Sequence, residues 1–383
     1  MKVGIVVPYS WSFWGGVPEH ADNQARALFE LGHEPRLIMG HDPPGRLTKL
    51  LHPREGRHER PPDYVLPVGR SVIVLANSSL PNLVLSPPSM LRMRRIFQRE
   101  RFDVIHVHEP FAPILSVYAL VIADCPVVVT CHSAGLDMRW YPMGKLCWGV
   151  AARKIDHRIA VSELAKASAE PYIGGPIEIL PNGVVVPPQA DPGGRRPHVV
   201  FIGRHERRKG LEILLRAWPD VTRRTGARLR VLGADPLSVR WLMRRKDLAD
   251  QGIDLLGSVP EDARTRELLE ASLLVAPSLR GESFGLILME AFACATPVVA
   301  SAIEGYDRVV EADTGLLVPP GDPRSLADAV VGLLENEPLR RRMGAAARVL
   351  AEERYSWTRV AGRLVEIYSE LTGVRARRTV AVA

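Results

Sequence analysis

A short basic segment in the second half of the sequence has the residue types of an anion-binding loop. Arg204 and Lys209 lie in it, each next to a glycine, directly after a β-branched run that predicts a strand. Two fixed cations on one loop suit a diphosphate, because an arginine can bind two phosphate oxygens at once. The alternative is an ordinary basic surface loop, since Arg207 and Arg208 stand between the two.

Residues 281–290 (Gly-Glu-Ser-Phe-Gly-Leu-Ile-Leu-Met-Glu) lead into a helix that is apolar on almost every side and hence buried. The small, polar start of such a helix can present free N–H groups to a phosphate. On a regular helix, Glu282 and Glu290 would share nearly one face, about 12 Å apart along the axis. Because a buried carboxylate is costly unless it is paired, we expect both to meet ligand hydroxyls. A capping Glu282 and a satisfied core Glu290 are the structural alternative.

Gly15 and Gly16 stand between the first expected strand and the first expected helix. Such a pair allows positive φ angles and lets a ligand approach backbone N–H groups, where a helix N-terminus carries partial positive charge. A plain tight turn is the alternative.

Motifs for metals and common cofactors have no counterpart in the sequence. His106 and His108 put two imidazoles on one strand face, yet no third ligand is evident. We therefore expect no metal site there. Instead we expect the two histidines to lie at the end of the strand and to face a cleft. The sequence contains no G-x-G-x-x-G after a strand, no G-x-x-x-x-G-K-[ST], no H-E-x-x-H and no D-x-D. These absences disfavour dinucleotide oxidoreductases, P-loop nucleotidases and the simplest metal-dependent enzymes.

The elements that must position these residues alternate between short β-branched runs and helical stretches, a pattern typical of parallel sheets covered by helices. In the first half we expect a helix at 19–31 and strands at 3–8, 35–39, 72–75, 104–107, 127–131, 158–161 and 178–180. In the second half we expect a helix from Leu211 and strands at 198–202, 228–232, 254–256, 273–276 and 297–300. A linker at 187–196 separates the halves, and a periodic segment at 356–371 predicts a last helix. The sequence thus predicts an α/β fold of two doubly wound domains, whose strand ends line a shared crevice.

Composition places the chain among globular proteins. Of 383 residues, 46% are hydrophobic and 24% charged, and no apolar run approaches the roughly 20 residues that span a bilayer. The start of the chain lacks a signal-peptide pattern, and the four cysteines form no C-x-x-C pair, so we expect reduced thiols and a cytoplasmic protein. The formal net charge of +7 attracts the phosphates of a nucleic acid, an anionic membrane or a nucleotide. A solvated, arginine-rich surface is the alternative.

Residues 91–101 form a basic amphipathic segment with five arginines and one glutamate. On a helix some of the arginines share one face and apolar side chains lie along another. Such a helix can lie on an anionic membrane, where each cation contributes about 1 kcal/mol. An ordinary surface helix whose apolar face packs on the sheet is the alternative. The arginines that we expect at the membrane are Arg92, Arg94, Arg95 and Arg99.

The order of these motifs resembles a known family. The Gly-Arg-x4-Lys-Gly segment at 203–210 is followed about 70 residues later by Gly-Glu-Ser-Phe-Gly-x4-Glu at 281–290, and then by Ala-Thr-Pro-Val-Val-Ala-Ser. This combination resembles the retaining GT-B glycosyltransferases of family 4, across essentially the whole chain. A narrower resemblance, to actinobacterial phosphatidylinositol mannosyltransferases, is carried by Pro8-Tyr9-Ser10, Gly15-Gly16-Val17, His106-Val107-His108-Glu109-Pro110, Cys131-His132 and Pro181-Asn182-Gly183.

The resemblance implies two Rossmann-like domains facing a central cleft. The acceptor domain would be 1–187, the nucleotide-sugar domain 195–355, and the helix within 356–383 would cross back onto the first domain. The residues implied for catalysis are His132, Arg204, Lys209 and Glu282. Those implied for donor binding are Gly16, Arg204, Lys209, Val259, Glu282, Ser283, Phe284, Gly285, Leu286 and Glu290. Those implied for acceptor binding are Tyr9, Gly15 and His132.

The family also implies what several of these residues do. Arg204 and Lys209 would hold the diphosphate and stabilise the leaving nucleotide, while Gly16 would approach the phosphates from the opposite domain. Glu282 would hold sugar hydroxyls, and His132 would contact the sugar near the reacting carbon.

The family further implies contacts at the ends of the donor. Phe284 and Gly285 would offer backbone N–H groups, Glu290 would take the ribose hydroxyls, and backbone groups at Val259 would read the base. Arginine, lysine and helix N–H groups can stabilise a departing diphosphate without a metal, and we expect no cofactor beyond the nucleotide sugar. No side chain stands out as a covalent nucleophile, which fits the front-side mechanism proposed for retaining members.

We therefore expect a cytoplasmic hexosyltransferase, peripheral on the inner face of the membrane, with GDP-mannose as donor and a lipid-linked or polyol acceptor such as phosphatidylinositol. Family members carry basic residues in the segment matching 77–86 and shortly after the catalytic histidine, and this sequence has none at 77–86 or 133–137. That departure keeps open a UDP-sugar-dependent enzyme with a soluble acceptor. A nucleic-acid-binding protein is a more distant alternative, because no basic stripe carries interleaved aromatic residues.

Overall fold

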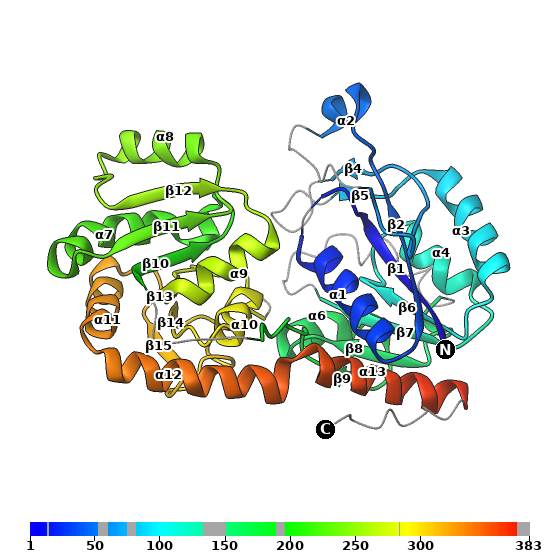
Figure 1. Ribbon diagram of the computed structural model, residues 1–383. Coiled ribbons are helices and arrows are strands. Elements are labelled where there is room, and N and C mark those ends of the chain that lie inside the picture. The colour runs from blue at the N-terminus through cyan, green and yellow to red at the C-terminus, as the bar shows by residue number, and fades with distance from the viewer. Residues whose placement is uncertain are drawn as a thin grey trace. The chain divides into compact units, whose positions relative to one another are not determined.

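The computed structural model describes residues 1–13, 15–52, 60–74, 82–132, 151–188, 196–282 and 284–373. The chain divides into two compact units (Figure 1). The first unit is Met1–Gly183 together with Trp357–Ala383, and the second is Val184–Ser356. No described helix combines the length and the apolar composition needed to span a bilayer.

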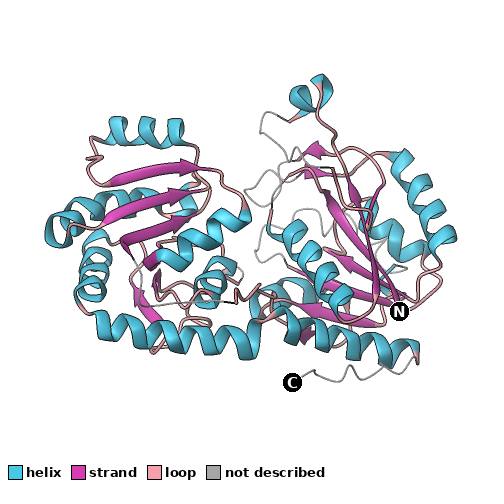
Figure 2. Ribbon diagram, viewed as in Figure 1, coloured by secondary structure: helices cyan, strands magenta, loops and turns pink. Residues whose placement is uncertain are grey.

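The first unit is built on a parallel sheet (Figure 2). Its strands, in spatial order, are β3 (Val65–Pro67), β2 (Glu34–Gly40), β1 (Lys2–Ser10), β6 (Val104–His108), β7 (Val127–Cys131), β8 (His157–Ala160) and β9 (Glu178–Ile179). Two short strands, β4 (Val72–Ile73) and β5 (Asn82–Leu83), pair with each other, and β5 runs antiparallel to β1. Every residue of β6 and β7 is buried, as expected for a sheet covered on both faces.

Helices cover both faces of this sheet. They are α1 (Gly16–Glu30), α3 (Pro87–Glu100), α4 (Leu115–Ile122), α6 (Glu163–Ile173) and α13 (Trp357–Thr372). The short helix α2 (Arg46–Leu51) has no buried residue. Apolar side chains of α1 and α13 share one core cluster with the sheet. Those of α3, α4 and α6 form the core on the other side.

The second unit contains a fully parallel sheet. Its strands, in spatial order, are β12 (Ile253–Gly257), β11 (Arg228–Leu232), β10 (Arg196–Ile202), β13 (Ala271–Ala276), β14 (Val298–Ser301) and β15 (Gly315–Val318). Its helices are η2 (Arg207–Lys209), α7 (Leu211–Thr225), α8 (Pro236–Lys246), α9 (Glu261–Glu270), α10 (Leu286–Ala293), α11 (Pro323–Glu335), α12 (Glu337–Leu350) and the π-helical turn η3 (Ala351–Tyr355). Side chains of α9 and α10 pack on one face of the sheet, and those of α7, α8 and α11 on the other.

Both sheets reverse their strand order beside their first strand. In the first unit β1 lies between β2 and β6, and in the second β10 lies between β11 and β13. The loops that leave the two central strands at such a point diverge to opposite faces, and ligands of doubly wound sheets bind in the opening between them. We therefore expect each unit to bind its ligand at these loops.

The structure corrects several expected elements. The strand expected at 72–75 is reduced to Val72–Ile73 and pairs only antiparallel. Strands β3, β5 and β15 were not expected, because each contains at most one β-branched residue. The first helix begins at Gly16, three residues before the expected start. The helix expected at 91–101 begins at Pro87, because prolines fit the first turn, where a missing N–H costs nothing.

Helix α13 returns from the end of the chain to the first unit. Its Tyr368 is fully buried and its hydroxyl hydrogen-bonds with His106 Nδ1 at 2.5 Å. Its Arg363 pairs with Glu178 at 2.8 Å. The last helix is thus part of the core of the first unit.

The loop after β10 passes so close to the loop after β13 that only glycine fits at position 210. Gly210 has a φ of +69°, and a Cβ there would lie 1.8 Å from the carbonyl oxygen of Pro277. Gly226, at the other end of α7, has a φ of +68° but no atom within 4 Å of such a Cβ.

We expect Gly226→Ala to destabilise the protein by about 1 kcal/mol, the cost of a left-handed alanine. Gly210→Ala should cost at least about twice as much, because backbone must also move. Urea unfolding of the two variants measures the difference. Equal losses would contradict the close approach of the two loops.

Candidate active site

Cations and carboxylates alternate along the loops that leave β10 and β13. Arg204 Nη2 lies 2.9 Å from Glu206 Oε1, and Arg208 Nε lies 2.9 Å from Glu206 Oε2. Arg208 Nη1 and Lys209 Nζ then lie 2.9 and 2.7 Å from the same oxygen, Oε1 of Glu282. Three cations and two carboxylates thus form one connected network at the strand-order reversal of the second unit.

Backbone contacts hold the two loops of this network in register. The amide of Leu279 donates to the carbonyl oxygen of Arg208 at 2.7 Å. Ser278 Oγ lies 3.3 Å from Glu282 Oε1 and 3.1 Å from the hydroxyl of Tyr306. Burial, aided by the charge of Glu282, raises the pKa of Tyr306 above its ordinary value, so this hydroxyl stays protonated and can donate.

The helical spacing expected for Glu282 and Glu290 is wrong, because α10 begins only at Leu286. Gly285, with a φ of +76°, precedes the helix and leaves Glu282 in the loop. Glu290 lies within α10, where its Oε2 is 3.0 Å from Nε of Arg264 on α9. The charge of Glu290 is therefore balanced by Arg264 within the second unit, and its role toward ribose hydroxyls stays a prediction.

The remaining residues expected at the donor lie around the start of α10 and beyond β12. Phe284 is buried and packs edge-on against Tyr355, so only its backbone can contact a ligand. Leu286 is the first residue of α10 and is half-buried, as is Val259, two residues after β12. Ser283 lies outside the described residues.

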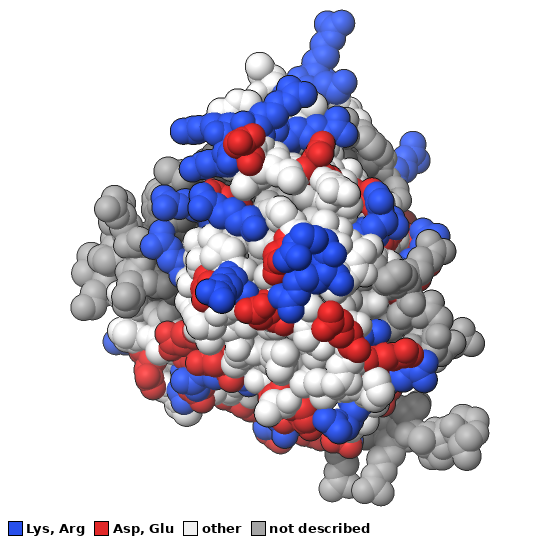
Figure 3. Space-filling view, turned by 90° about the vertical axis from the view of Figure 1, so that its left-hand side faces the viewer, with Lys and Arg blue, Asp and Glu red and all other residues white. Residues whose placement is uncertain are grey.

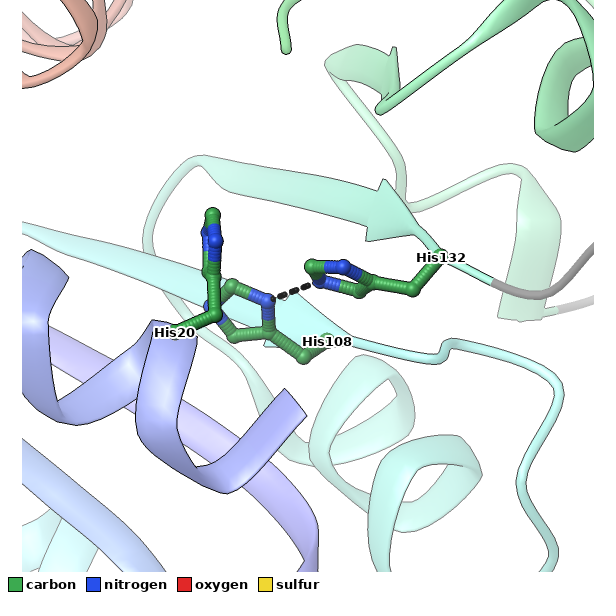
Figure 4. A group of neighbouring side chains, drawn as sticks. All are labelled: His20, His108 and His132. Carbon is green, nitrogen blue, oxygen red and sulfur yellow. Dashed lines mark hydrogen bonds between the residues drawn. The ribbon is translucent and has the colours of Figure 1, made fainter. Parts of the chain in front are cut away.

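Three buried histidines meet in the first unit (Figure 4). His20 comes from α1, His108 ends β6, and His132 directly follows β7. His108 Nδ1 and His132 Nε2 hydrogen-bond at 2.8 Å, and the amide of His132 donates to Glu109 Oε1 at 3.2 Å. The imidazole expected to contact the sugar is thus held by neighbours on the next strand.

Burial keeps these imidazoles neutral. It lowers the pKa of His132 to about 3, an effect that a side-chain hydrogen bond with Asn182 opposes. Burial also lowers the pKa values of His20 and His108 well below the ordinary value, and the neighbouring histidines lower them further. The cluster therefore offers neutral hydrogen-bonding nitrogens at physiological pH.

His20 supplies the third imidazole that was not evident in the sequence. One nitrogen from each of His20, His108 and His132 lies within 4.8 Å of the others, so the three could approach a metal ion. Two nitrogens on one tetrahedral zinc would be about 3.3 Å apart at the usual bond length of about 2.0 Å. The 2.8 Å contact between His108 and His132 is shorter, and it fits a hydrogen bond rather than a coordination shell.

His106 does not face a cleft as expected but is held inside the unit. Its Nε2 lies 2.6 Å from Oγ1 of Thr130, and its Nδ1 lies 3.0 Å from Nε2 of Gln24. The ring stacks on His108 with centroids 4.7 Å apart. Together with Tyr368 of α13, these partners fix the orientation of the strand that carries His108.

The two glycines before α1 adopt no positive φ angle, contrary to expectation. Gly15 is extended, with a φ of 179°, and Gly16 is the first residue of α1. A Cβ at Gly16 would meet no described atom within 4 Å, so the fold itself does not require glycine there. Tyr9 lies in β1, half-buried opposite Leu83 of β5.

One face of α3 packs on the core of the first unit, as the structural alternative required. Met93 and Phe97 are buried there, whereas Leu91 is 62% exposed. The opposite face exposes four arginines, of which one pairs with Glu100 at 2.8 Å. The exposed arginines are Arg92, Arg94, Arg95 and Arg99.

The sequence did not single out several residues that complete these clusters. Arg208 was treated as part of a basic run. Glu206 could not be recognised from the sequence, because the conformation of the loop brings Arg204 and Arg208 to it. His20 lies four residues after Gly16 on α1, and its position opposite β6 depends on how that helix packs. Glu109, with a left-handed φ of 49°, stood in a noted motif without an assigned role.

The buried histidines make the stability of the first unit depend on pH. Each stays neutral in the fold but accepts a proton in the unfolded chain below its ordinary pKa of about 6.5, which destabilises the fold by about 1.4 kcal/mol per pH unit. Stability should thus fall as the pH decreases from about 6.5. In His20→Gln this decline should be shallower, whereas His205→Gln, in the second unit, serves as control. Urea unfolding between pH 7.5 and 5.0 tests this, and parallel curves for wild type and His20→Gln would contradict it.

Comparisons with known proteins identify the family. The model described as Glycosyltransferase Family 4 matches residues 14–186, and that described as Glycosyl transferases group 1 matches 196–336. A phosphatidyl-myo-inositol mannosyltransferase of Mycobacterium leprae is 34% identical, over 96% of both chains. That of Mycolicibacterium smegmatis is 34% identical, over 97% of this chain and 95% of its own.

Among solved structures, HepE of Anabaena in complex with UDP has a similar fold. Its TM-score is 0.70 at 19% identity, covering 97% of this chain and all of HepE. The chain is therefore a glycosyltransferase of the GT-B fold, and it belongs to the family that includes the phosphatidyl-myo-inositol mannosyltransferases.

Proposed function

We propose that this glycosyltransferase transfers mannose from GDP-mannose to the inositol ring of phosphatidyl-myo-inositol. One observation carries the proposal: the two mycobacterial relatives named for this acceptor match the chain over at least 95% of each length. The likeness to HepE in its UDP complex extends to the fold alone, so it does not favour a UDP-sugar over GDP-mannose.

The cation network supports a donor diphosphate at the end of β10. Arg208 and Lys209 meet at Glu282, four residues before α10, and Arg204 joins them through Glu206. The N-terminus of α10 adds partial positive charge. As the nucleotide leaves, negative charge grows on its phosphates, and preorganised cations stabilise that charge. On this proposal no metal is needed to neutralise the leaving group.

The ion pair of Lys209 with Glu282 has a consequence for donor binding. A diphosphate that binds Lys209 competes with Glu282 for the ammonium group. We propose that the phosphate takes over this contact and that the carboxylate, still near Arg208, accepts hydrogen bonds from the sugar hydroxyls. The pair thus positions both groups before the donor arrives.

The transfer itself is proposed to proceed on one face of the sugar. The bond between the anomeric carbon and the diphosphate oxygen breaks, and the inositol oxygen bonds to the same face of that carbon. The inositol hydroxyl proton passes to the departing phosphate oxygen, so that atoms and charge balance. His132, kept neutral by burial, would hydrogen-bond a sugar hydroxyl near the reacting carbon without adding charge.

We further propose a cytoplasmic enzyme bound peripherally to the inner face of the membrane. Arg92, Arg94 and Arg95 on α3 are exposed and have no carboxylate partner among the described residues. Residues 82–86 carry no cation, and 133–137 lie outside the described residues. Attraction of α3 to anionic lipid would therefore help to bring the enzyme to its acceptor.

The proposed reaction is tested with purified protein, radiolabelled GDP-mannose or UDP-sugars, and either phosphatidylinositol vesicles or free myo-inositol. We expect labelled lipid from GDP-mannose and phosphatidylinositol, with a rate unchanged by excess EDTA. Digestion of the product with an α-mannosidase checks retention of configuration. Transfer from a UDP-sugar to a soluble acceptor alone would overturn the proposal.

The network predicts different losses for its cations and for Glu282. Lys209→Ala and Arg204→Ala should each slow transfer by about 3 kcal/mol, roughly a hundredfold, and should weaken GDP binding. Glu282→Ala should abolish transfer but leave GDP binding nearly intact. Calorimetric titration with GDP and initial rates measure both effects. Arg223→Ala, on the exposed side of α7 and paired with Asp220, is the control, and an equal loss of GDP affinity in Glu282→Ala would instead indicate a structural role.

A further inference from the structure

Helix α8 of the second unit exposes large apolar side chains next to arginines. Leu237 is 75% exposed and Trp241, one turn later, is 59% exposed. Arg240, Arg244 and Arg245 are exposed as well. Residues three and four apart lie on the same side of a helix, so these five side chains form one continuous face, here called the α8 face.

The fold does not need this face for packing. Val239, Leu242 and Met243 are buried and attach α8 to the core of the second unit. Leu237 and Trp241 lie on the other side, where their apolar surface remains in water. Burying such surface is favourable by about 25 cal/mol per Å², so the α8 face gains from any apolar medium that it can enter.

The charge of the α8 face is positive. Residues 236–246 contain four cations and no carboxylate. Figure 3 shows Lys and Arg gathered toward the top of the view, where α8 lies, and Asp and Glu are more frequent below. The three arginines of the face have no carboxylate partner among the described residues. Asp235 and Asp247 stand at the two ends of the helix, and the carboxylate of Asp235 accepts the amide of Ser238.

Arginine and tryptophan are in contact on this face. The guanidinium carbon of Arg245 lies 5.1 Å from the ring centroid of Trp241, within the range of a cation–π interaction. The contact places a positive charge over the face of an exposed apolar ring. Tryptophan favours the boundary between lipid headgroups and acyl chains, where ring and charge are both accommodated.

We propose that the α8 face is a membrane-contact surface that binds anionic phospholipid, with Leu237 and Trp241 inserted between headgroups and the arginines bound to their phosphates. A helix of 11 residues is about 16 Å long, which is small for a stable interface with another protein. A single exposed tryptophan also lacks the series of aromatic residues on which successive bases stack.

This surface offers more apolar area than α3 does. Met93 and Phe97 of α3 are buried in the core of the first unit, and Leu91 is its one exposed large apolar side chain, so its arginines attract lipid mainly through charge. The α8 face combines charge with exposed apolar side chains and belongs to the second unit. Its binding to lipid does not require phosphatidylinositol to be the acceptor.

The test measures sedimentation of the full-length protein with vesicles of phosphatidylcholine and phosphatidylglycerol, which contain no phosphatidylinositol. Leu237→Ser with Trp241→Ser should weaken binding at least tenfold. Changing Arg240, Arg244 and Arg245 together to Gln should weaken it about fivefold per arginine at low salt. Val349→Ser, on α12 and 50% exposed, is the matched apolar control and should bind like wild type.

A second measurement reports insertion itself. Brominated lipids should quench the fluorescence of Trp241, so Trp241→Phe should bind vesicles with less quenching than wild type. The substitutions of the α8 face can also be combined with replacement of Arg92, Arg94, Arg95 and Arg99 by Gln. The combined variant should lose the vesicle binding that remains. Transfer to a water-soluble, short-chain phosphatidylinositol should be unchanged in the α8 variants, which separates this proposal from the proposed function.

Three outcomes would overturn the proposal. The first is equal vesicle binding by wild type and the Leu237→Ser, Trp241→Ser variant. The second is a wild-type dimer in sedimentation velocity that the same variant lacks, which would assign the face to a second copy of the chain. The third is salt-sensitive oligonucleotide binding that the arginine changes abolish while vesicle binding persists.

Discussion

The carboxyl ends of parallel strands meet at one edge of a sheet, and the candidate site residues on the loops that leave these strands depend on this constraint. In the second unit it brings Lys209, from the loop after β10, within 2.7 Å of Glu282, from the loop after β13. In the first unit it brings His108 and His132 together at the ends of β6 and β7. Because only loops that leave such an edge can converge, residues 73 positions apart, such as Lys209 and Glu282, form one site.

The network around Glu282 links the fold of the second unit to its chemistry. Its carboxylate is bound by two cations from one loop and lies near Ser278, whose hydroxyl also contacts buried Tyr306. A half-buried carboxylate would be costly without these partners. The same partners hold it in one position, which is the preorganisation that binding of a charged donor requires. Stability and ligand binding therefore draw on the same contacts.

The sequence predicts the sheet well and the contacts between loops poorly. The unbroken β-branched run of β7 and the alternation of arginine with apolar residues in β11 both indicate strands, and the observed bounds match the expected ones. Strand β15 (Gly-Leu-Leu-Val) has one β-branched residue and therefore carries too little pattern. The partners Glu206 and Arg264 could not be foreseen, because each depends on how a loop or a neighbouring helix folds. The helical spacing assumed for Glu282 failed since the left-handed Gly285 delays the start of α10.

Helices α3 and α8 show what a basic amphipathic pattern leaves undecided. Both carry arginines interleaved with large apolar side chains, and hydropathy alone does not say which apolar residues face the sheet. In α3, Met93 and Phe97 pack against the sheet, so the surface that remains is mainly charged. In α8 the sheet takes a different apolar set, and Leu237 and Trp241 are left outside. The side of a helix that packs on the core thus determines whether the same composition yields an electrostatic surface or one that can also enter an apolar medium.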